Sequence, residues 1–194
     1  MGAEVPARND EGSDLDGPTR DTLLRLARLA VRAALLGEEP PPVPPLQGLR
    51  CARGAFVSLH TRGGELRGCV GLLRSDLPLG ETVKRMAAAA ATADGRFLPV
   101  RAHELEDLVI EISALGSLRP IRPEDVVIGV HGLLLRARGR SGVLLPQVAV
   151  ANGWHREEFL DRTAEKAGLP EDAWRREDVE LFAFTAEVFG EHQA

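Results

Sequence analysis

Hydrophobic positions along this 194-residue chain follow two periods, one typical of helices and one typical of strands. Apolar side chains recur every three or four residues over residues 23–34, which predicts a helix that begins at Thr19 or Asp21 and ends at Gly37. Helical spacing or an alanine-rich composition predicts two further helices: residues 79–93 and 159–167. The alanines of the second helix allow it to pack closely on a sheet.

Short runs of β-branched and other apolar residues predict at least six strands. The runs are residues 55–61, 66–73, 108–113, 126–130, 133–137, 143–145 and 179–188. Gly63 and Gly64 supply a tight turn that joins the first two runs into a hairpin. Hairpins that alternate with single helices indicate an α+β fold with a mainly antiparallel sheet. The order hairpin, helix, strand occurs twice, which indicates two related halves.

The two ends of the chain differ in organisation. Residues 1–18 lack periodicity and are rich in acidic residues, glycine and proline, which predicts a disordered tail. Residues 19–194 are expected to form one domain, with room for two lobes. The composition, 44% hydrophobic and 27% charged, is that of a soluble globular protein.

Charge and leader patterns argue against several classes of partner. A net charge of -5 without a long Lys/Arg run disfavours nucleic acid. The acidic N-terminus is unlike a secretory signal, and the apolar run 86–91 is far below the roughly 20 residues that span a bilayer. Cys51 and Cys69 are interpreted as reduced thiols. We therefore expect a cytoplasmic protein with neither a nucleic-acid nor a membrane partner.

The stretch Leu66–Gly71, which reads Leu-Arg-Gly-Cys-Val-Gly, is unusual for a strand. Glycine weakens a strand, so Gly68 and Gly71 around Cys69 indicate a bulge or a close approach by another group. Period-two alternation places Arg67 and Cys69 on one face. Packing alone gives little reason for this composition, so the stretch is the first candidate site.

Cys69 is a candidate catalytic nucleophile, because a thiolate is reactive and a nearby cation, Arg67 or Arg96, would lower the pKa of its thiol. The alternative is a small buried side chain, since free cysteine is among the most buried residue types. His131, beside Gly132, is the candidate base for Cys69. Its alternative is a histidine that bonds its own turn.

Arg67 and Arg96 are also candidate ligand-binding residues, because guanidinium groups bind phosphates and carboxylates in bidentate fashion. Their alternative is a structural ion pair with Glu111 or Asp94, although Glu111 is expected to face solvent. Gln147 would add an amide contact to a ligand or bond a neighbouring backbone group. No metal or cofactor is expected, because the five histidines show no ligand spacing with either cysteine.

Six segments of the chain carry a resemblance to one protein family. They are Leu66–Gly71, Asp94–Phe97, Val130–Leu133, Leu144–Ala149, Gly153–Trp154 and Lys166–Leu169. Together they resemble the AMMECR protein family, whose bacterial and archaeal members are also called AmmeMemoRadiSam system protein A. The similarity covers roughly residues 23–191, and the Leu-Arg-Gly-Cys motif is its most specific part.

The resemblance implies an α+β fold with a barrel-like antiparallel sheet built from two related halves and flanked by helices. It also implies a role beside a Memo-like protein and a radical SAM protein, without an established activity. This chain departs from the family pattern at Leu98, where a second proline is frequent, and at Thr163, where relatives carry a cysteine. The second departure argues against a mechanism that uses two cysteines.

Two hypotheses follow from these residues. The favoured one is a non-catalytic accessory or ligand-binding protein, in which the Memo-like or the radical SAM protein carries the chemistry. The alternative is a cysteine-dependent enzyme that acts on a small anionic substrate in a cleft lined by Cys69, His131, Arg67 and Arg96. The enzyme hypothesis requires a reactive Cys69 thiol, whereas the accessory-protein hypothesis does not.

Overall fold

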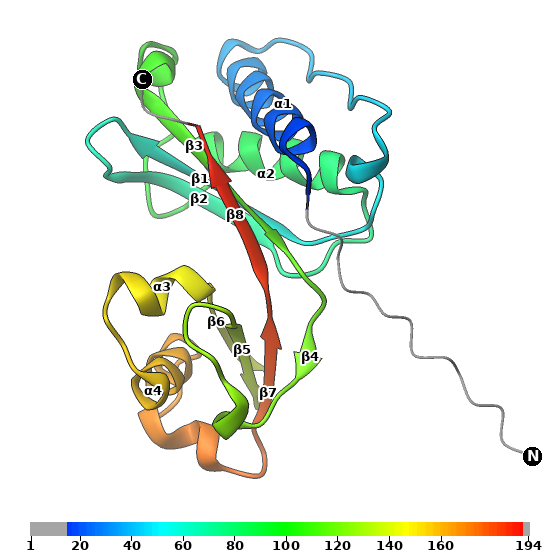
Figure 1. The fold of residues 1–194 in the computed structure, drawn as a ribbon. Helices are drawn as coiled ribbons and strands as arrows, with labels where there is room; N and C mark the ends of the chain where they lie inside the picture. The colour runs from blue at the N-terminus through cyan, green and yellow to red at the C-terminus, as the bar shows by residue number, and fades with distance from the viewer. Residues whose placement is uncertain (1–14, 192–194) are drawn as a thin grey trace, which may run out of the picture.

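The structure is a computed structural model that describes residues 15–191, which form two lobes with one four-stranded antiparallel sheet each (Figure 1). Of the expected disordered tail, residues 1–14 lie outside the described residues. Helix α1 (Gly17–Leu36) begins before the expected start. Asp16 is its N-cap, because the Asp16 carboxylate accepts the Thr19 N–H at 2.9 Å.

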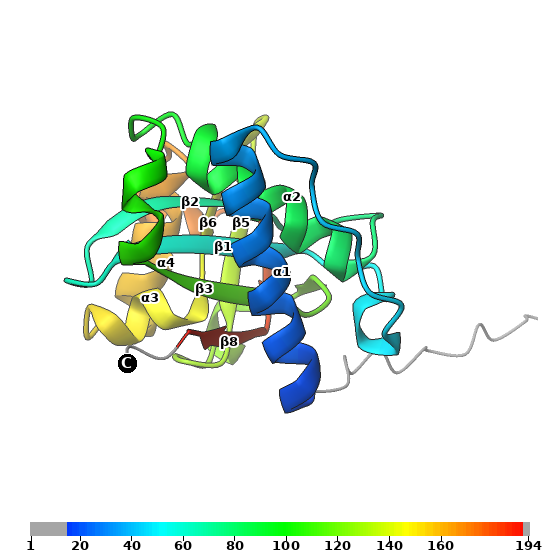
Figure 2. The same ribbon diagram turned by 90° about the horizontal axis from the view of Figure 1, so that it is seen from above.

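The larger lobe is a sheet with helices on one face. Its strands, in spatial order, are β2 (Leu66–Leu72), β1 (Ala55–Thr61), β3 (Leu108–Leu115) and β8 (Ala186–Gly190). Helices α1 and α2 (Leu79–Thr92) cover the same face of this sheet (Figure 2). Leu59 and Ile110 of the sheet are fully buried against Leu23 and Val83 of the helices. Two short 3-10 helices complete the lobe: η1 (Gln47–Leu49) and η2 (Ala102–Asp107).

The smaller lobe has its own core. Its strands, in spatial order, are β4 (Arg119–Pro120), β7 (Glu180–Phe184), β5 (Gly132–Ala137) and β6 (Arg140–Leu144). Its helices are α3 (Pro146–Ala151) and α4 (Arg156–Lys166), with 3-10 helices η3 (Pro123–Asp125) and η4 (Glu171–Arg175). Phe159 and Leu160 of α4 are buried against Leu133 and Leu135 of β5.

The two lobes share one topology and exchange their fourth strands. In the larger lobe the hairpin β1-β2 is followed by α2 and by β3, which pairs with β1. In the smaller lobe the hairpin β5-β6 is followed by α3, α4 and β7, which pairs with β5. The strand after β3, β4, pairs with β7, whereas the strand after β7, β8, pairs with β3. The chain therefore crosses between the lobes twice.

The two crossings lie side by side. The Gly116 N–H after β3 donates to the Thr185 carbonyl between β7 and β8 at 2.8 Å. A Cβ at Gly116 would overlap Oγ1 of Thr185, so this contact requires glycine. The two crossings are thus hydrogen-bonded to each other.

The predicted α+β class and the antiparallel pairing are confirmed, and the repeated order of elements matches the expected two halves. The sheets, however, are two open sheets and not one closed barrel. The strand predicted over residues 126–130 is wrong. This segment turns, with the Val130 and His131 N–H groups both bonded to the Val127 carbonyl and Gly129 at φ 81°. None of the described helices is long and apolar enough to cross a membrane.

Candidate functional site

The glycines of the Leu66–Gly71 stretch are explained by close approaches on both faces of β2. A Cβ at Gly68 would overlap the carbonyl oxygen of Ala90, so this glycine lets α2 lie directly on the strand. A Cβ at Gly71 would overlap the ring of Phe56, its cross-strand partner on β1. Both features expected at this strand are present: the close approaches are made by the protein itself, and a register shift opposite Leu59 and His60 leaves Arg67 at a bulge.

The main chain of Cys69 is bound by a loop that follows α2. β2 is an edge strand, and the outward-facing Cys69 N–H donates to Oδ2 of Asp94 at 2.8 Å. Nη2 of Arg96 donates to the Cys69 carbonyl at 3.1 Å and to Asp94 at 2.7 Å. The hydrogen bond from Arg96 holds the pKa of the Asp94 carboxyl well below its usual range. The Asp94–Arg96 pair thus takes the place of a neighbouring strand at Cys69.

Arg67 is bound in the same way, by a carboxylate and by main-chain carbonyls. Its guanidinium donates to both Glu104 oxygens, at 2.8 and 3.1 Å, and to the carbonyls of Leu98 and Pro99. This bidentate pair lowers the pKa of the Glu104 carboxyl. Arg67 and Arg96 therefore form structural ion pairs, which was the alternative to ligand binding. Asp94 was an expected partner, whereas Glu104 was not.

The thiol of Cys69 faces away from the helices. Ser58 Oγ on β1 donates to Cys69 Sγ at 3.2 Å, and Ser58 is also directly opposite Glu111 on β3. Glu111 is half-buried and forms no hydrogen bond or ion pair through its carboxylate within residues 15–191. Cys69, Ser58 and Glu111 therefore make one polar row across three strands. Cys51, the other free thiol, is exposed.

His131 and Gln147 both come from the smaller lobe. Nδ1 of His131 accepts the Val127 N–H at 3.1 Å, so this histidine bonds its own turn. Gln147, at the start of α3, donates from Nε2 to Oγ of Ser113 on the larger sheet at 3.1 Å. Its Oε1 is buried and has no partner within the described chain. The structure thus brings Arg67, Cys69 and Arg96 together, places Gln147 against the same sheet, and gives His131 no bond to Cys69.

Sequence reasoning missed Ser58 and Glu104. Ser58 lies opposite Cys69 only because the β1-β2 register shifts by one residue between Leu59 and His60, a bulge that the Gly63-Gly64 turn alone does not predict. Glu104 carried no signal either, since it reaches Arg67 from a 3-10 helix distant in sequence. No group of three or more His, Cys, Asp or Glu side chains in the described part of the chain is placed to hold a metal ion.

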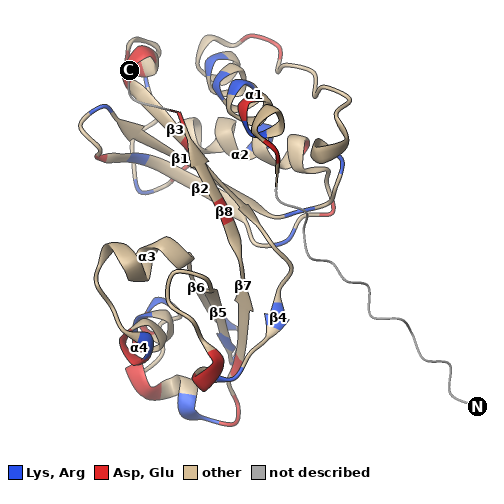
Figure 3. Ribbon diagram, in the orientation of Figure 1, with Lys and Arg blue, Asp and Glu red and all other residues tan. Residues whose placement is uncertain are grey.

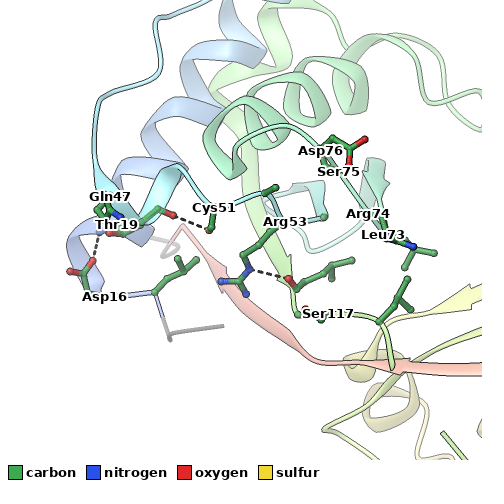
Figure 4. Close-up of a pocket in the computed structure, with 17 residues that line it drawn as sticks. Asp16, Thr19, Gln47, Cys51, Arg53, Leu73, Arg74, Ser75, Asp76 and Ser117 are labelled. Carbon is green, nitrogen blue, oxygen red and sulfur yellow. Dashed lines mark hydrogen bonds between the residues drawn. The ribbon is translucent and has the colours of Figure 1, made fainter. Parts of the chain in front are cut away.

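A cleft of about 1040 Å³ lies away from this motif, at the end of the larger sheet (Figure 4). It is bordered by the start of α1, the connection from β2 to α2, and the crossing after β3. Arg53 lies in its middle, with Nε bonded to the Leu115 carbonyl at 2.9 Å and Nη2 to Glu187 at 3.0 Å. Arg74 lines the far end and has no ion pair within residues 15–191. None of the five candidate site residues lines this cleft.

Comparison with known proteins identifies the family. A family model described as AMMECR1 matches residues 24–189. The chain belongs to the AMMECR1 family. A protein of Aeropyrum pernix is 40% identical over 195 residues, covering 96% of this chain and 83% of its own length. One of Methanopyrus kandleri is 41% identical over 181 residues, covering 88% and 87%.

A crystal structure of an uncharacterised protein from Pyrococcus horikoshii has the same fold. The TM-score is 0.80 at 40% sequence identity, and the match covers 88% of this chain and 90% of that one. The family predicted from the motifs is therefore confirmed. In this AMMECR1 chain the Leu-Arg-Gly-Cys motif forms an edge strand, and the Cys69 thiol faces away from the helix packing that explains Gly68.

Proposed function

We propose that this AMMECR1 chain is a non-catalytic accessory protein that works by binding, and that its partners are a Memo-like protein and a radical SAM protein. One observation carries the proposal: both arginines near Cys69 are already paired with carboxylates. Arg96 binds Asp94, and Arg67 binds Glu104. A catalytic thiol needs a free cation or base beside it. Arg96 does interact with the Cys69 side chain, but its charge is already paired with Asp94.

We propose a cytoplasmic role without a nucleic-acid partner. Helix α1 carries four arginines and one aspartate (Figure 3), but three of the arginines are already paired with Glu187, Glu191 and Glu38. The net charge of the chain is -5. A phosphate backbone is bound by a face of one sign, which this arrangement does not offer.

The cleft is the better place for a small anionic ligand. Arg67 and Arg96 are already paired with carboxylates, whereas Arg74 is exposed at the cleft with no ion pair within residues 15–191. Titration with inorganic phosphate, followed by NMR, should shift the amides around Arg74 and should fail to do so in Arg74→Gln. The matched control is Arg25→Gln, on the exposed face of α1.

Thiol labelling separates the accessory protein from the enzyme, because the chain carries its own reference thiol. Cys51→Ala and Cys69→Ala each leave one cysteine for a thiol-selective reagent at neutral pH. An accessory protein predicts that half-buried Cys69 reacts several times more slowly than exposed Cys51. Faster labelling of Cys69 would contradict the proposal.

Partner binding is tested by calorimetry with the purified Memo-like and radical SAM proteins of the same organism. The accessory role predicts that at least one of them binds, and that Cys69→Ala binds as tightly as the wild type. Absence of binding to both would count against it.

The enzyme remains the second candidate because of the polar row. The Ser58 hydroxyl donates to the Cys69 thiol, and the strand register places Ser58 between that thiol and Glu111, whose carboxylate has no partner within residues 15–191. A carboxylate in the same row is a candidate base for the thiol proton. This alternative predicts fast labelling of Cys69 that slows in Ser58→Ala and in Glu111→Gln.

A further inference from the structure

The two edges of the larger sheet are treated differently. At β2, Asp94 and Arg96 bind the outward N–H and carbonyl of Cys69. At β8, two hydrogen bonds just beyond its ends show which residues turn their main-chain groups toward β3. The Glu191 N–H donates to the Ile110 carbonyl, and the Gly116 N–H donates to the Thr185 carbonyl. Alternate residues of a strand turn their main-chain groups to opposite sides. Ala186, Val188 and Gly190 therefore point outward.

The outward groups of β8 are unbonded within residues 15–191, and β8 forms the rim of the sheet in Figure 2. Folded proteins usually protect such an edge with a charge, a proline or a bulge. β8 has none of these on its outward positions, and its register with β3 is regular. Val188, in the middle, is 41% exposed. This edge is suited to pairing with another strand.

α1 holds β8 firmly in an extended form. Glu187 binds Arg20 and Arg53, and Glu191 pairs with Arg28 of α1. These charges lie on the helix-covered face, as does Phe189, which packs on the core. The edge is therefore preorganised, and its own charges are satisfied without an incoming strand.

We propose that β8 pairs with β8 of a second copy of this chain, antiparallel, about a two-fold axis at Val188. The larger sheets of the two copies then form one continuous sheet. Val188 meets its own copy, and Ala186 meets Gly190. All three outward residues of each copy find main-chain partners in this register.

The side chains of β8 match themselves about this axis, as a two-fold interface requires. Ala186 opposite Gly190 brings no bulky pair together, and the two valines make an apolar cross-strand pair. On the other face Glu187 lies opposite Phe189, so like charges are not opposed. A register shifted by two residues leaves one end of β8 overhanging. This self-match favours a second copy over an unrelated strand.

Charge pairs at Val188 test both the partner and the register. Sedimentation velocity over a concentration series should show a wild-type dimer. Val188→Lys and Val188→Glu should each weaken it by at least roughly tenfold, because like charges then meet on the axis. An equimolar mixture of the two should restore the dimer. The matched control is Leu72→Lys on β2, 40% exposed, which should leave the dimer unchanged.

Amide hydrogen exchange gives a second measurement on the full chain. Dimerisation predicts that the amides of Ala186, Val188 and Gly190 become protected as concentration rises, whereas those of Glu187 and Phe189, already bonded to β3, stay protected throughout. A chain that is monomeric up to roughly 1 mM overturns the proposal. So does protection of the three amides in a monomer, because some other segment then covers the edge.

Discussion

Gly68 and Gly71 leave space for different groups on the two faces of β2. Gly68 admits the Ala90 carbonyl of α2, and Gly71 lies under the ring of Phe56. The sequence indicated a bulge or a close approach at this strand, because two glycines in seven residues weaken a strand and leave no side chain to pack. It did not show what comes close, because both groups come from elements whose placement depends on the whole lobe.

Gly68→Ala should destabilise the protein by about 3 kcal/mol, because the new methyl group meets helix backbone that has nowhere to move. Urea unfolding measures this directly. Gly95→Ala is the control, since a Cβ there meets open space without a left-handed φ, and its effect should be close to zero. Equal stabilities of the two variants would show that α2 does not press on β2 as described.

The sequence predicted the contacts of some candidate residues and not those of others. Strand alternation predicts a shared face for Arg67 and Cys69, but it does not predict the bulge at which Arg67 lies. That Arg67 would bind Glu104 could not be foreseen, since the two residues meet only when η2 is laid across the end of the sheet. The turn-bonded His131 was the local alternative, and local hydrogen bonds are the kind that sequence predicts best.

At the level of elements, the loop Asp94–Arg96 acts as a substitute strand for the edge of β2. Asp94 accepts as a neighbouring carbonyl would, and Arg96 donates as a neighbouring N–H would. The carboxylate must be charged to hold Arg96, which is why its pKa is lowered. Stability at this edge is therefore coupled to pH.

A carboxyl whose pKa is lowered on folding stabilises the protein above its ordinary pKa of 3.8, and this contribution is lost as pH falls below that value. Asp94→Asn keeps an acceptor for Cys69 but loses the charge. It should lower stability at pH 7 and flatten the loss of stability between pH about 5 and 2 in urea unfolding. Asp178→Asn, which removes an exposed pair with Arg138, should change neither. A steep wild-type slope retained in Asp94→Asn would contradict this assignment.

Helix and strand patterns predicted most elements because each buries one regular face. They failed over residues 126–130, where the apolar run reads as a strand but Val127 and Val130 are half exposed. Gly129, with φ 81°, and the bonds to the Val127 carbonyl make this a turn. Composition alone did not distinguish the two, since periodicity over five residues is weak.

At the level of the whole molecule, the two cores are separate. The larger lobe buries the residues around Leu59, and the smaller lobe those around Leu160. Both tryptophans, Trp154 and Trp174, pack on the smaller core, and the chain has no tyrosine. Intrinsic fluorescence therefore reports on the smaller lobe, whereas far-UV circular dichroism reports on both.

Leu160→Ala should lower the urea midpoint seen by fluorescence more than the midpoint seen by circular dichroism. Leu59→Ala should do the reverse, each change removing roughly 2–5 kcal/mol from its own core. Coincident midpoints in both variants would mean that the crossing at Gly116 and Thr185 couples the lobes into one cooperative unit.

The exchange of fourth strands also sets an order in time. A ribosome delivers every strand of the smaller lobe before it delivers β8, the last strand of the larger one. Until then Arg53, whose side chain is only 11% exposed in the folded protein, has no Glu187 to pair with. The sheet of the first three strands is therefore completed only when the last strand has been made. A chain released before Ala186 would carry a finished smaller lobe on an unfinished larger one.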